Sequence, residues 1–179
     1  MTDRLPAVQK PLVIDVISHS PAQTVRIGER LGALLRPGDL VVLHGPFGAG
    51  KTHLIKGIGR GLGVAEEDVT SPSFVLINEY QAAADRGGFP VLHVDLYRLE
   101  SGSADFESIG LEECWEGHSL CLIEWAERAQ ELLPAERLEI TLDHLSETKR
   151  VIRMEPRGRR YEEVLAQLKG RAFSWPGRR

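Results

Sequence analysis

Short apolar runs alternate with amphipathic stretches along most of this chain, and this pattern predicts strands that alternate with helices. Residues 11–17 alternate and are rich in β-branched side chains, as is typical of a strand. Apolar residues then recur at helical spacing from Ile27 to Leu35. The residues before them, Ser-Pro-Ala-Gln at 20–23, have the types that begin a helix, with Ser20 as the N-cap.

The rest of the pattern predicts a core strand and several later elements. The run at 39–44 is short and apolar enough for a buried parallel strand, and a helical pattern follows over 52–60. Later strands are expected at 75–80, 89–96, 119–123, 137–142 and 151–154. Later helical segments are expected at 104–115, 126–133 and around Tyr161, Val164, Leu165 and Leu168.

This order of elements indicates the fold class. Strands and helices alternate at first and paired strands follow, so the sheet should be mixed rather than purely parallel. We therefore expect a single-domain α/β protein, with a mixed but mostly parallel sheet flanked by helices. Residues 1–10 resemble a flexible leader, 11–171 the folded domain and 172–179 a tail.

Composition adds the cellular setting. The chain has 179 residues, 42% hydrophobic and 27% charged, which is ordinary for a globular protein with one core. No apolar run approaches the roughly 20 residues of a membrane span, and the first residues lack the build of a signal peptide. Cys114 and Cys121 are too far apart for a C-x-x-C motif, and we expect them to be reduced. The expected location is cytoplasmic, without membrane contact.

Charge is unevenly distributed along the chain. The formal net charge is −4, yet residues 149–179 contain ten Lys and Arg against three Asp and Glu. Such a segment can meet nucleic acid or an acidic partner, or it can be a solvated surface with a frayed end. The sequence leaves both readings open.

One motif dominates the candidate chemistry. Residues 45–52 read Gly-Pro-Phe-Gly-Ala-Gly-Lys-Thr, a complete phosphate-binding loop between a predicted strand and a predicted helix. Its three glycines allow a tight turn, Lys51 would reach the β- and γ-phosphates, and the Thr52 hydroxyl would bind Mg²⁺. The residues expected at a bound nucleotide are Gly45, Pro46, Phe47, Gly48, Ala49, Gly50, Lys51, Thr52 and His53. These features predict a P-loop NTPase fold.

Such a protein needs an acidic residue at the end of a neighbouring strand, to hold Mg²⁺ or to position water. Asp95 and Glu124 both follow apolar runs that read as strands. Either one alone can be a solvent-facing carboxylate, but two such carboxylates beside a P-loop favour a functional pair. His93 alternates with Asp95 and should face the same side of the sheet. It can orient Asp95, or it can be an ordinary buried histidine.

Weaker candidates surround these residues. Trp125 follows Glu124 and can stack on a base, or it can be a core tryptophan. Residues 70–74 form a hydroxyl-rich loop, with Ser71 and Ser73, where a switch that senses the γ-phosphate would lie. We expect His44, like His53, to pack or to face solvent rather than to act in catalysis.

Together these motifs resemble the TsaE (YjeE) family of ATPases. The resemblance rests on the P-loop, Ser71-Pro-Ser-Phe74, His93-Val-Asp-Leu-Tyr-Arg98 and Ile123-Glu-Trp125, in that order and spacing, and runs from about residue 20 to 153. The chain departs from the family where Pro46-Phe47 replaces the usual Asp-Leu, and where His53 and Ser73 replace Thr. None of these positions supplies the lysine or the metal-binding hydroxyl.

The resemblance implies an ATPase that serves tRNA modification. It would use ATP and Mg²⁺ in the installation of threonylcarbamoyl on adenosine 37, acting on a TsaB–TsaD pair and meeting tRNA only through that complex. Lys51, Asp95 and Glu124 would be catalytic, Thr52 and Glu124 would hold the metal, and Ser71 and Ser73 would belong to the switch. Trp125 would lie near the nucleotide. The adenine pocket would include Ser20, Thr24 and Arg150.

Other functions are compatible with the P-loop alone. A small-molecule kinase would need an arginine-bearing lid, for which Arg86 in the 81–88 loop is a thin candidate. A GTPase is less favoured, because Asp85-Arg-Gly-Gly88 matches D-x-x-G but no N-K-x-D motif exists. A non-catalytic module that uses ATP only as a structural ligand is disfavoured by the presence of both acids. With no obvious arginine finger, we expect slow hydrolysis by the chain alone.

Overall fold

The computed structural model describes residues 11–72, 76–99, 111–115 and 117–173. The expected leader at 1–10 and most of the expected tail lie outside these residues. The strands are β1 (Ile14–Ser18), β2 (Leu40–His44), β3 (Ile77–Gln81), β4 (Pro90–Asp95), β5 (Leu120–Glu124), β6 (Arg137–His144) and β7 (Arg150–Arg157). The helices are α1 (Pro21–Gly32), α2 (Lys51–Gly61) and α4 (Arg159–Phe173), with short 3-10 helices η1 (Ala84–Arg86), η2 (Leu111–Trp115) and η3 (Ala126–Ala129).

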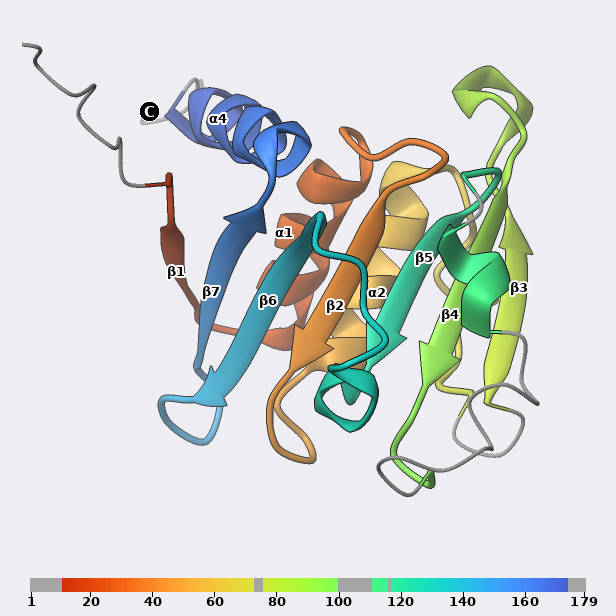
Figure 1. Cartoon of the computed structure of the whole chain (residues 1–179). Helices are drawn as coiled ribbons and strands as arrows, with labels where there is room; N and C mark the ends of the chain where they lie inside the picture. Colours follow the sequence, from red (N-terminus) through yellow and green to blue (C-terminus); the bar gives the residue numbers. More distant parts are fainter. Residues whose placement is uncertain (1–10, 73–75, 100–110, 116, 174–179) are drawn as a thin grey trace, which may run out of the picture.

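The seven strands form one mixed sheet, which confirms the expected fold class. Their order is β1-β7-β6-β2-β5-β4-β3 (Figure 1). The central strands β6, β2, β5 and β4 are parallel to one another, whereas β7, β1 and β3 run antiparallel to their neighbours. The carboxyl ends of β2, β5 and β4 therefore meet at one edge, and this edge holds the P-loop.

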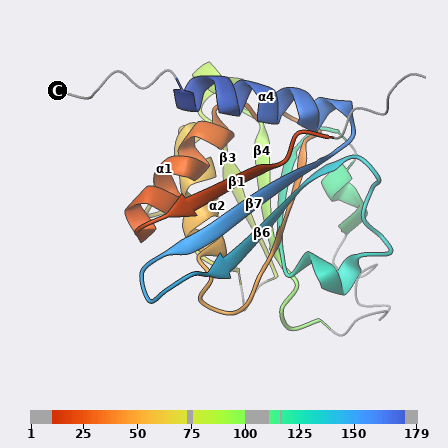
Figure 2. The ribbon, with the colours of Figure 1, turned by 90° about the vertical axis from the view of Figure 1, so that its left-hand side faces the viewer.

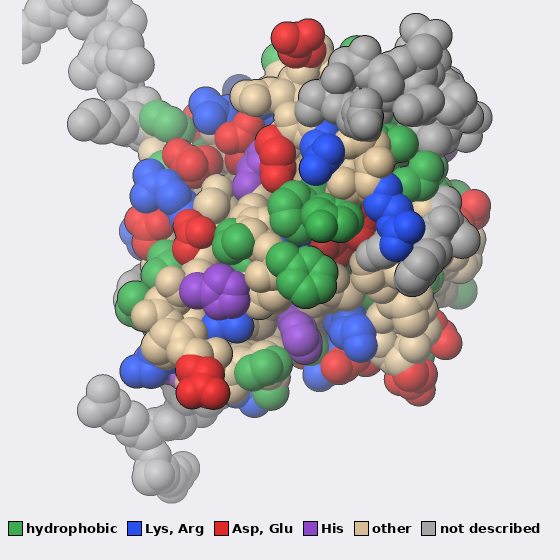
Figure 3. Space-filling model, turned by 90° about the horizontal axis from the view of Figure 1, so that it is seen from below, with side chains coloured by type: hydrophobic (Ala, Val, Ile, Leu, Met, Phe, Trp, Pro, Cys, Tyr) green, Lys and Arg blue, Asp and Glu red, His purple; other side chains and the backbone are tan. Residues whose placement is uncertain are grey.

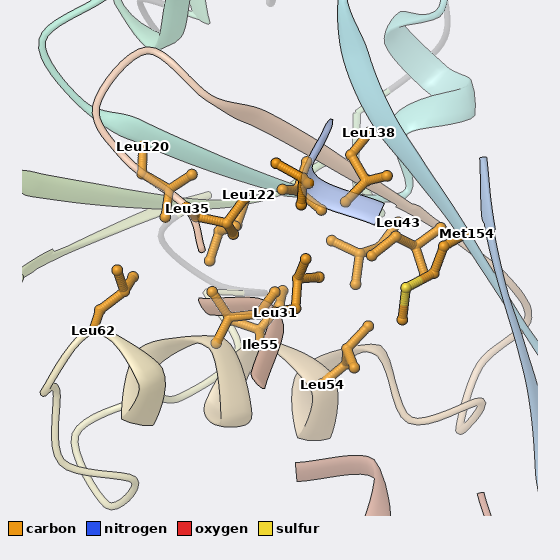
Figure 4. Packing of buried hydrophobic residues seen from close by; sticks show 14 of the residues in the cluster. Leu31, Leu35, Leu43, Leu54, Ile55, Leu62, Leu120, Leu122, Leu138 and Met154 are labelled. Atoms are coloured by element: carbon orange, nitrogen blue, oxygen red, sulfur yellow. The ribbon is translucent and has the colours of Figure 1, made fainter. Parts of the chain in front are cut away.

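The sheet is covered differently on its two faces (Figure 2). Helices α1 and α2 pack on one face, and α4 lies across the end of the sheet remote from the P-loop. The opposite face is covered by η2 and η3, together with Leu96 and Leu99 after β4. Alternate residues of β2 accordingly enter two separate cores, Val41 and Leu43 on the helical side and Leu40 and Val42 on the other. Figure 4 shows the helical side, where leucine and isoleucine side chains of α1 and α2 meet those of the strands.

Helices α1 and α2 approach each other so closely that only glycine fits at four positions. A Cβ atom added at Gly28 or Gly32 of α1 would lie 2.2 Å from a backbone oxygen of α2. At Gly57 and Gly61 of α2 the corresponding distances to α1 are 2.0 and 2.3 Å. The two helices therefore pack backbone to backbone, and this fixes α2 beneath the P-loop.

Local signals explain where several elements begin. Ser20 caps α1 as expected, and its hydroxyl accepts a hydrogen bond from the Gln23 backbone N–H. The start of α4 is fixed to β2 by an ion pair of 2.6 Å between Arg160 and the buried Asp39. The hydroxyl of Tyr161 accepts the Leu40 backbone N–H in the same place. Burial raises the pKa of Tyr161 to about 12.

Two expectations about secondary structure need correction. The helix expected at 126–133 is only the short η3, which ends at Ala129. It starts from Trp125, whose backbone is left-handed with φ 60° and ψ 38°, and helical spacing over a short segment does not distinguish a regular helix from a 3-10 turn. The first helix ends at Gly32 and does not include Leu34 and Leu35. Both cysteines are free and buried, as expected.

Candidate functional site

A cavity of about 330 Å³ lies at the carboxyl end of the central strands. This volume is within the range of small-molecule sites. Figure 3 looks onto this end of the molecule, where hydrophobic side chains gather near the centre of the face, with histidines and charged groups around them. The cavity is lined by Phe47, Gly48, Ala49, Gly50, Lys51, Thr52, His53, Ser71, Asp95, Tyr97, Glu124 and Trp125. Most of the predicted site residues are therefore brought together.

The P-loop backbone has the form that its sequence predicts. Gly45, Gly48 and Gly50 have φ values of 138°, 74° and 98°, a region that residues with a Cβ atom rarely adopt. A Cβ atom at Gly45 would also lie 2.2 Å from the Leu142 carbonyl oxygen of β6. The loop leads directly into α2, whose N-terminus carries partial positive charge toward the cavity edge.

Lys51 is held inside this loop. Its ammonium donates hydrogen bonds to the carbonyl oxygens of Gly45 and Pro46, at 2.6 and 3.0 Å. The same ammonium lies 3.9 Å from the centre of the Trp125 ring. Burial lowers the pKa of Lys51, while the carboxylates of Glu124, Glu127 and Asp95 act to raise it. The lysine is thus preorganised beside a group of carboxylates.

The two predicted acids end neighbouring strands and stand side by side. Asp95 of β4 is the direct register partner of Glu124 of β5, and both are nearly fully buried. Glu124 Oε1 accepts a hydrogen bond of 3.0 Å from the Thr52 hydroxyl. Asp95 accepts one from the Tyr97 backbone N–H at 2.9 Å and one from the Ser71 hydroxyl at 3.1 Å. Glu124 is therefore linked directly to the first turn of α2, and Asp95 to the loop that carries Ser71.

This donor set fits a magnesium ion bound together with a nucleotide. In the described part of the chain, no group of three or more His, Cys, Asp or Glu side chains could hold a metal by itself. Mg²⁺ in phosphate-transfer sites does not need such a cage, because one or two carboxylates are joined by phosphate oxygens and water. A Thr52 hydroxyl next to a buried Glu124 carboxylate supplies oxygen ligands of that kind.

Trp125 lies at the phosphate end of the cavity. Its ring packs against Lys51 on one side and against Tyr97 on another, with 4.9 Å between the centroids of the two aromatic rings. The ring is thus in contact with the P-loop lysine, and its role beside a bound nucleotide stays a prediction. Tyr97 was not singled out from the sequence, although it lies in the quoted His-Val-Asp-Leu-Tyr-Arg motif.

The expected adenine pocket is not gathered at this cavity. Ser20 caps α1, and the buried Thr24 hydroxyl forms a 2.7 Å hydrogen bond with Ser18. Arg150 donates to carbonyl oxygens of the β6–β7 turn and, at 3.3 Å, to the carbonyl oxygen of Gly48. Arg150 therefore braces the P-loop from outside. A role of these residues at adenine stays a prediction.

Other candidates from the sequence are placed as follows. Ser71 faces Asp95, while Ser73 lies outside the described residues. His44 pairs with Glu127 at 3.2 Å, and His53 lines the cavity. The histidine expected to orient Asp95, His93, instead lies 3.0 Å from Glu124 Oε1. Its position on β4 predicted the correct face of the sheet, but the register with β5 decides which acid it meets.

The loop that suggested a kinase lid or a GTPase motif lies far from the P-loop. Residues 81–88 connect β3 to β4 at the opposite end of the sheet (Figure 1). Arg86 there donates a 2.9 Å hydrogen bond to the Ala33 carbonyl oxygen, beyond the end of α1. Its position gives it a structural contact and removes it as a lid for this cavity.

Much of the basic C-terminal charge is balanced within the molecule. Four arginines form ion pairs with carboxylates, namely Arg153 with Asp15, Arg157 with Glu139, Arg159 with Glu163 and Arg160 with Asp39. These pairs favour the reading of a solvated protein surface over a free basic patch. No helix in the described residues has the length and apolar character needed to cross a membrane.

Comparisons with known proteins agree with the resemblance seen in the motifs. Residues 18–152 match the family model of the threonylcarbamoyl adenosine biosynthesis protein TsaE. A TsaE protein of Bacillus subtilis is 39% identical over 149 residues, covering 83% of this chain and 89% of that protein. A TsaE protein of Treponema pallidum is 42% identical over 136 residues, covering 76% and 96% respectively. The crystal structure of YdiB from Bacillus subtilis superposes with a TM-score of 0.75, at 32% identity, and covers 92% of this chain and 99% of that one.

Proposed function

This chain belongs to the TsaE family of threonylcarbamoyl adenosine biosynthesis proteins, and we propose that it is the ATP-hydrolysing component of that tRNA modification system. Its substrate would be ATP with Mg²⁺, and its partner a TsaB–TsaD-like pair that modifies adenosine 37. The observation that carries the proposal is the convergence of Lys51, Thr52, Asp95 and Glu124 on one cavity, from the P-loop and the ends of two adjacent strands.

Each of these residues has a contact that suits its proposed role. The ATP phosphates would lie over the P-loop, where Lys51 and the N-terminus of α2 offer positive charge. Thr52 and Glu124, already joined by a hydrogen bond, would hold the metal. When bound, Mg²⁺ would neutralise charge on the phosphate oxygens.

Asp95 is proposed to orient the attacking water. Its two carboxylate oxygens accept hydrogen bonds from the Tyr97 backbone and the Ser71 side chain, so its orientation is fixed before any substrate enters. The loop that contains Ser71, proposed as part of a switch, would keep Asp95 in this orientation while the nucleotide is bound. Preorganised groups of this kind accelerate hydrolysis because they need no rearrangement during the reaction.

Slow turnover by the isolated chain is expected. Lys51 is the only Lys or Arg among the described residues that line the cavity, so no arginine is in place to stabilise charge on the transferring phosphoryl group. A partner protein can supply such an arginine, or it can order the residues of the site. The chain would therefore act as a component of an assembly.

The test is Mg²⁺-dependent ATP hydrolysis, measured for the chain alone and with a purified TsaB–TsaD pair. Lys51→Ala serves as the blank because it removes the phosphate-binding ammonium and leaves the glycine turn intact. Slow hydrolysis that rises with the pair and is absent in the variant is the expected result. A hydrolysis rate that does not change when the pair is added would contradict the proposed partner. Hydrolysis that persists in the variant would contradict the assignment of this cavity as the ATPase site.

A further inference from the structure

A buried histidine joins Glu124 of the candidate metal site to strand β3, and through it to the loop that carries Ser71. His93 of β4 is completely buried, and its ring nitrogens face two different groups. Nε2 lies 3.0 Å from Glu124 Oε1, and Nδ1 lies 3.4 Å from the Tyr80 hydroxyl on β3. Each ring nitrogen therefore has a neighbour with which it can form a hydrogen bond. A buried nitrogen without such a partner would reduce the free energy of unfolding.

We propose that His93 is a positioning residue that fixes the orientation of the Glu124 carboxylate at the metal site. Glu124 Oε1 accepts both from His93 and from the Thr52 hydroxyl, which is also 3.0 Å away. Two donors on one oxygen determine the rotation of the carboxylate and leave Oε2 directed elsewhere. The inference rests on the proposed function only in assigning Glu124 to the metal.

The contact with Glu124 determines that Nε2 of His93 carries a proton. An ionised carboxylate only accepts hydrogen bonds, so Nε2 must hold a hydrogen to bond Glu124. On the other side of the ring, the single proton of the Tyr80 hydroxyl is shared between the Thr70 carbonyl oxygen at 3.0 Å and Nδ1 at 3.4 Å, so Glu124 alone assigns the ring. Outer partners that fix the tautomer and orientation in this way commonly accompany metal ligands.

Tyr80 extends the chain of contacts to the loop that carries Ser71. Its hydroxyl lies 3.0 Å from the Thr70 carbonyl oxygen and 3.3 Å from the Thr70 backbone nitrogen. Asn78 adds a hydrogen bond of 3.1 Å to the same carbonyl oxygen. The loop is thus attached to Glu124 through Tyr80 and His93, and to Asp95 through Ser71. Both acids of the site are positioned from one loop.

A matched pair of variants distinguishes the contact made by Nε2 from the contact made by Nδ1. In His93→Gln, the amide can occupy the place of Nε2 and keep the contact with Glu124. In His93→Asn, the shorter amide can occupy the place of Nδ1 and keep the contact with Tyr80 only. Thermal unfolding of both establishes that they are folded, and calorimetry then measures binding of a non-hydrolysable ATP analogue with Mg²⁺ and with EDTA.

The two variants should differ only where the metal is involved. We expect His93→Asn to weaken Mg²⁺-dependent binding by about 10- to 100-fold, as for other outer partners of metal ligands. Binding in EDTA should be unchanged, and His93→Gln should stay close to wild type under both conditions. Equal losses in the two variants, or losses of the same size in EDTA, would show a merely structural histidine and overturn the proposal.

A second measurement needs neither metal nor nucleotide. Nitrogen NMR of the full-length protein should show a proton on Nε2 of His93, and an Nε2 without a proton would overturn the proposal even if one variant failed to fold. Wild-type binding that is indifferent to Mg²⁺ would instead reject the metal assignment of Glu124, and so the proposed function. The NMR result would still decide whether His93 holds Glu124.

Discussion

The ammonium of Lys51 lies 3.9 Å from the centre of the Trp125 ring, so the P-loop lysine and the residue after Glu124 form a direct cation–π contact. Trp125 makes this contact from a left-handed backbone conformation, with φ 60°. Such a conformation costs about 1 kcal/mol or more for a residue with a Cβ atom. The site thus retains local strain in order to place an aromatic ring against its lysine.

This strain predicts a difference between two variants that both lack the ring. Trp125→Gly should be more stable than Trp125→Ala by about 1 kcal/mol, because glycine adopts positive φ without steric cost. Denaturant unfolding of the two proteins measures the difference. Equal free energies of unfolding would mean that the backbone at 125 relaxes once the indole is gone.

The contact between α1 and α2 predicts a large effect from a single methyl group. Gly57→Ala would place its Cβ about 2.0 Å from the Val25 carbonyl oxygen, so the helices must separate, and we expect a loss of about 3 kcal/mol or more. Gly170→Ala in α4 is the matched control, because among the described residues no atom outside its own helix lies within 4 Å of its added Cβ. That change should raise stability by up to about 1 kcal/mol through helix propensity. Thermal unfolding tests both, and similar effects would contradict the packing described.

The ion pairs of Glu139 predict a stability effect with a defined pH dependence. Burial acts to raise the pKa of Glu139, but the hydrogen bonds from Arg157 and Arg137 outweigh it, and the pKa falls below its ordinary value. The contribution to stability is therefore present above the unfolded value, near pH 4.5, and is lost as the pH falls through the folded pKa. Glu139→Gln should cost about 1 kcal/mol at pH 7.

The same variant should lose almost nothing at pH values below the folded pKa, where Glu139 is protonated in the wild type as well. Urea unfolding of both proteins across this range gives the two curves. A difference that is constant with pH would mean that shape or packing, rather than charge, explains the loss.

Asp95 is expected to affect turnover more than binding. Asp95→Asn keeps an oxygen for the Tyr97 backbone N–H and an amide for Ser71, so the local geometry should survive. Loss of the charged acceptor should reduce hydrolysis by about 10²- to 10⁴-fold, while affinity for a non-hydrolysable analogue stays near that of wild type. Parallel loss of binding would assign Asp95 to substrate or metal binding instead.

The features that depend on local sequence were predictable. The glycines and lysine of 45–52 and the N-cap at Ser20 act through neighbours a few residues away, and each acid is marked by the apolar run that precedes it. The structure places them as the sequence predicts, with Asp95 and Glu124 side by side.

The features that depend on register or on contact between helices were not predictable. His93 meets Glu124 because of the pairing of β4 with β5, which alternation along one strand cannot show. The close approach of α1 and α2 had a signal, since Gly28 and Gly32, like Gly57 and Gly61, are spaced by one helical turn. The helix expected after Trp125 is only the 3-10 helix η3, because helical spacing over so few residues is compatible with either structure.

The position of β1 at one edge of the sheet has a consequence for how the chain is made. Among the described strands its only partner is β7, where Ile14 lies opposite Met154. During synthesis the first strand must therefore wait until the distant β7 has been translated, a delay on the order of ten seconds at usual elongation rates. Closure of the sheet at this edge is a late event, and contacts this distant along the chain slow folding.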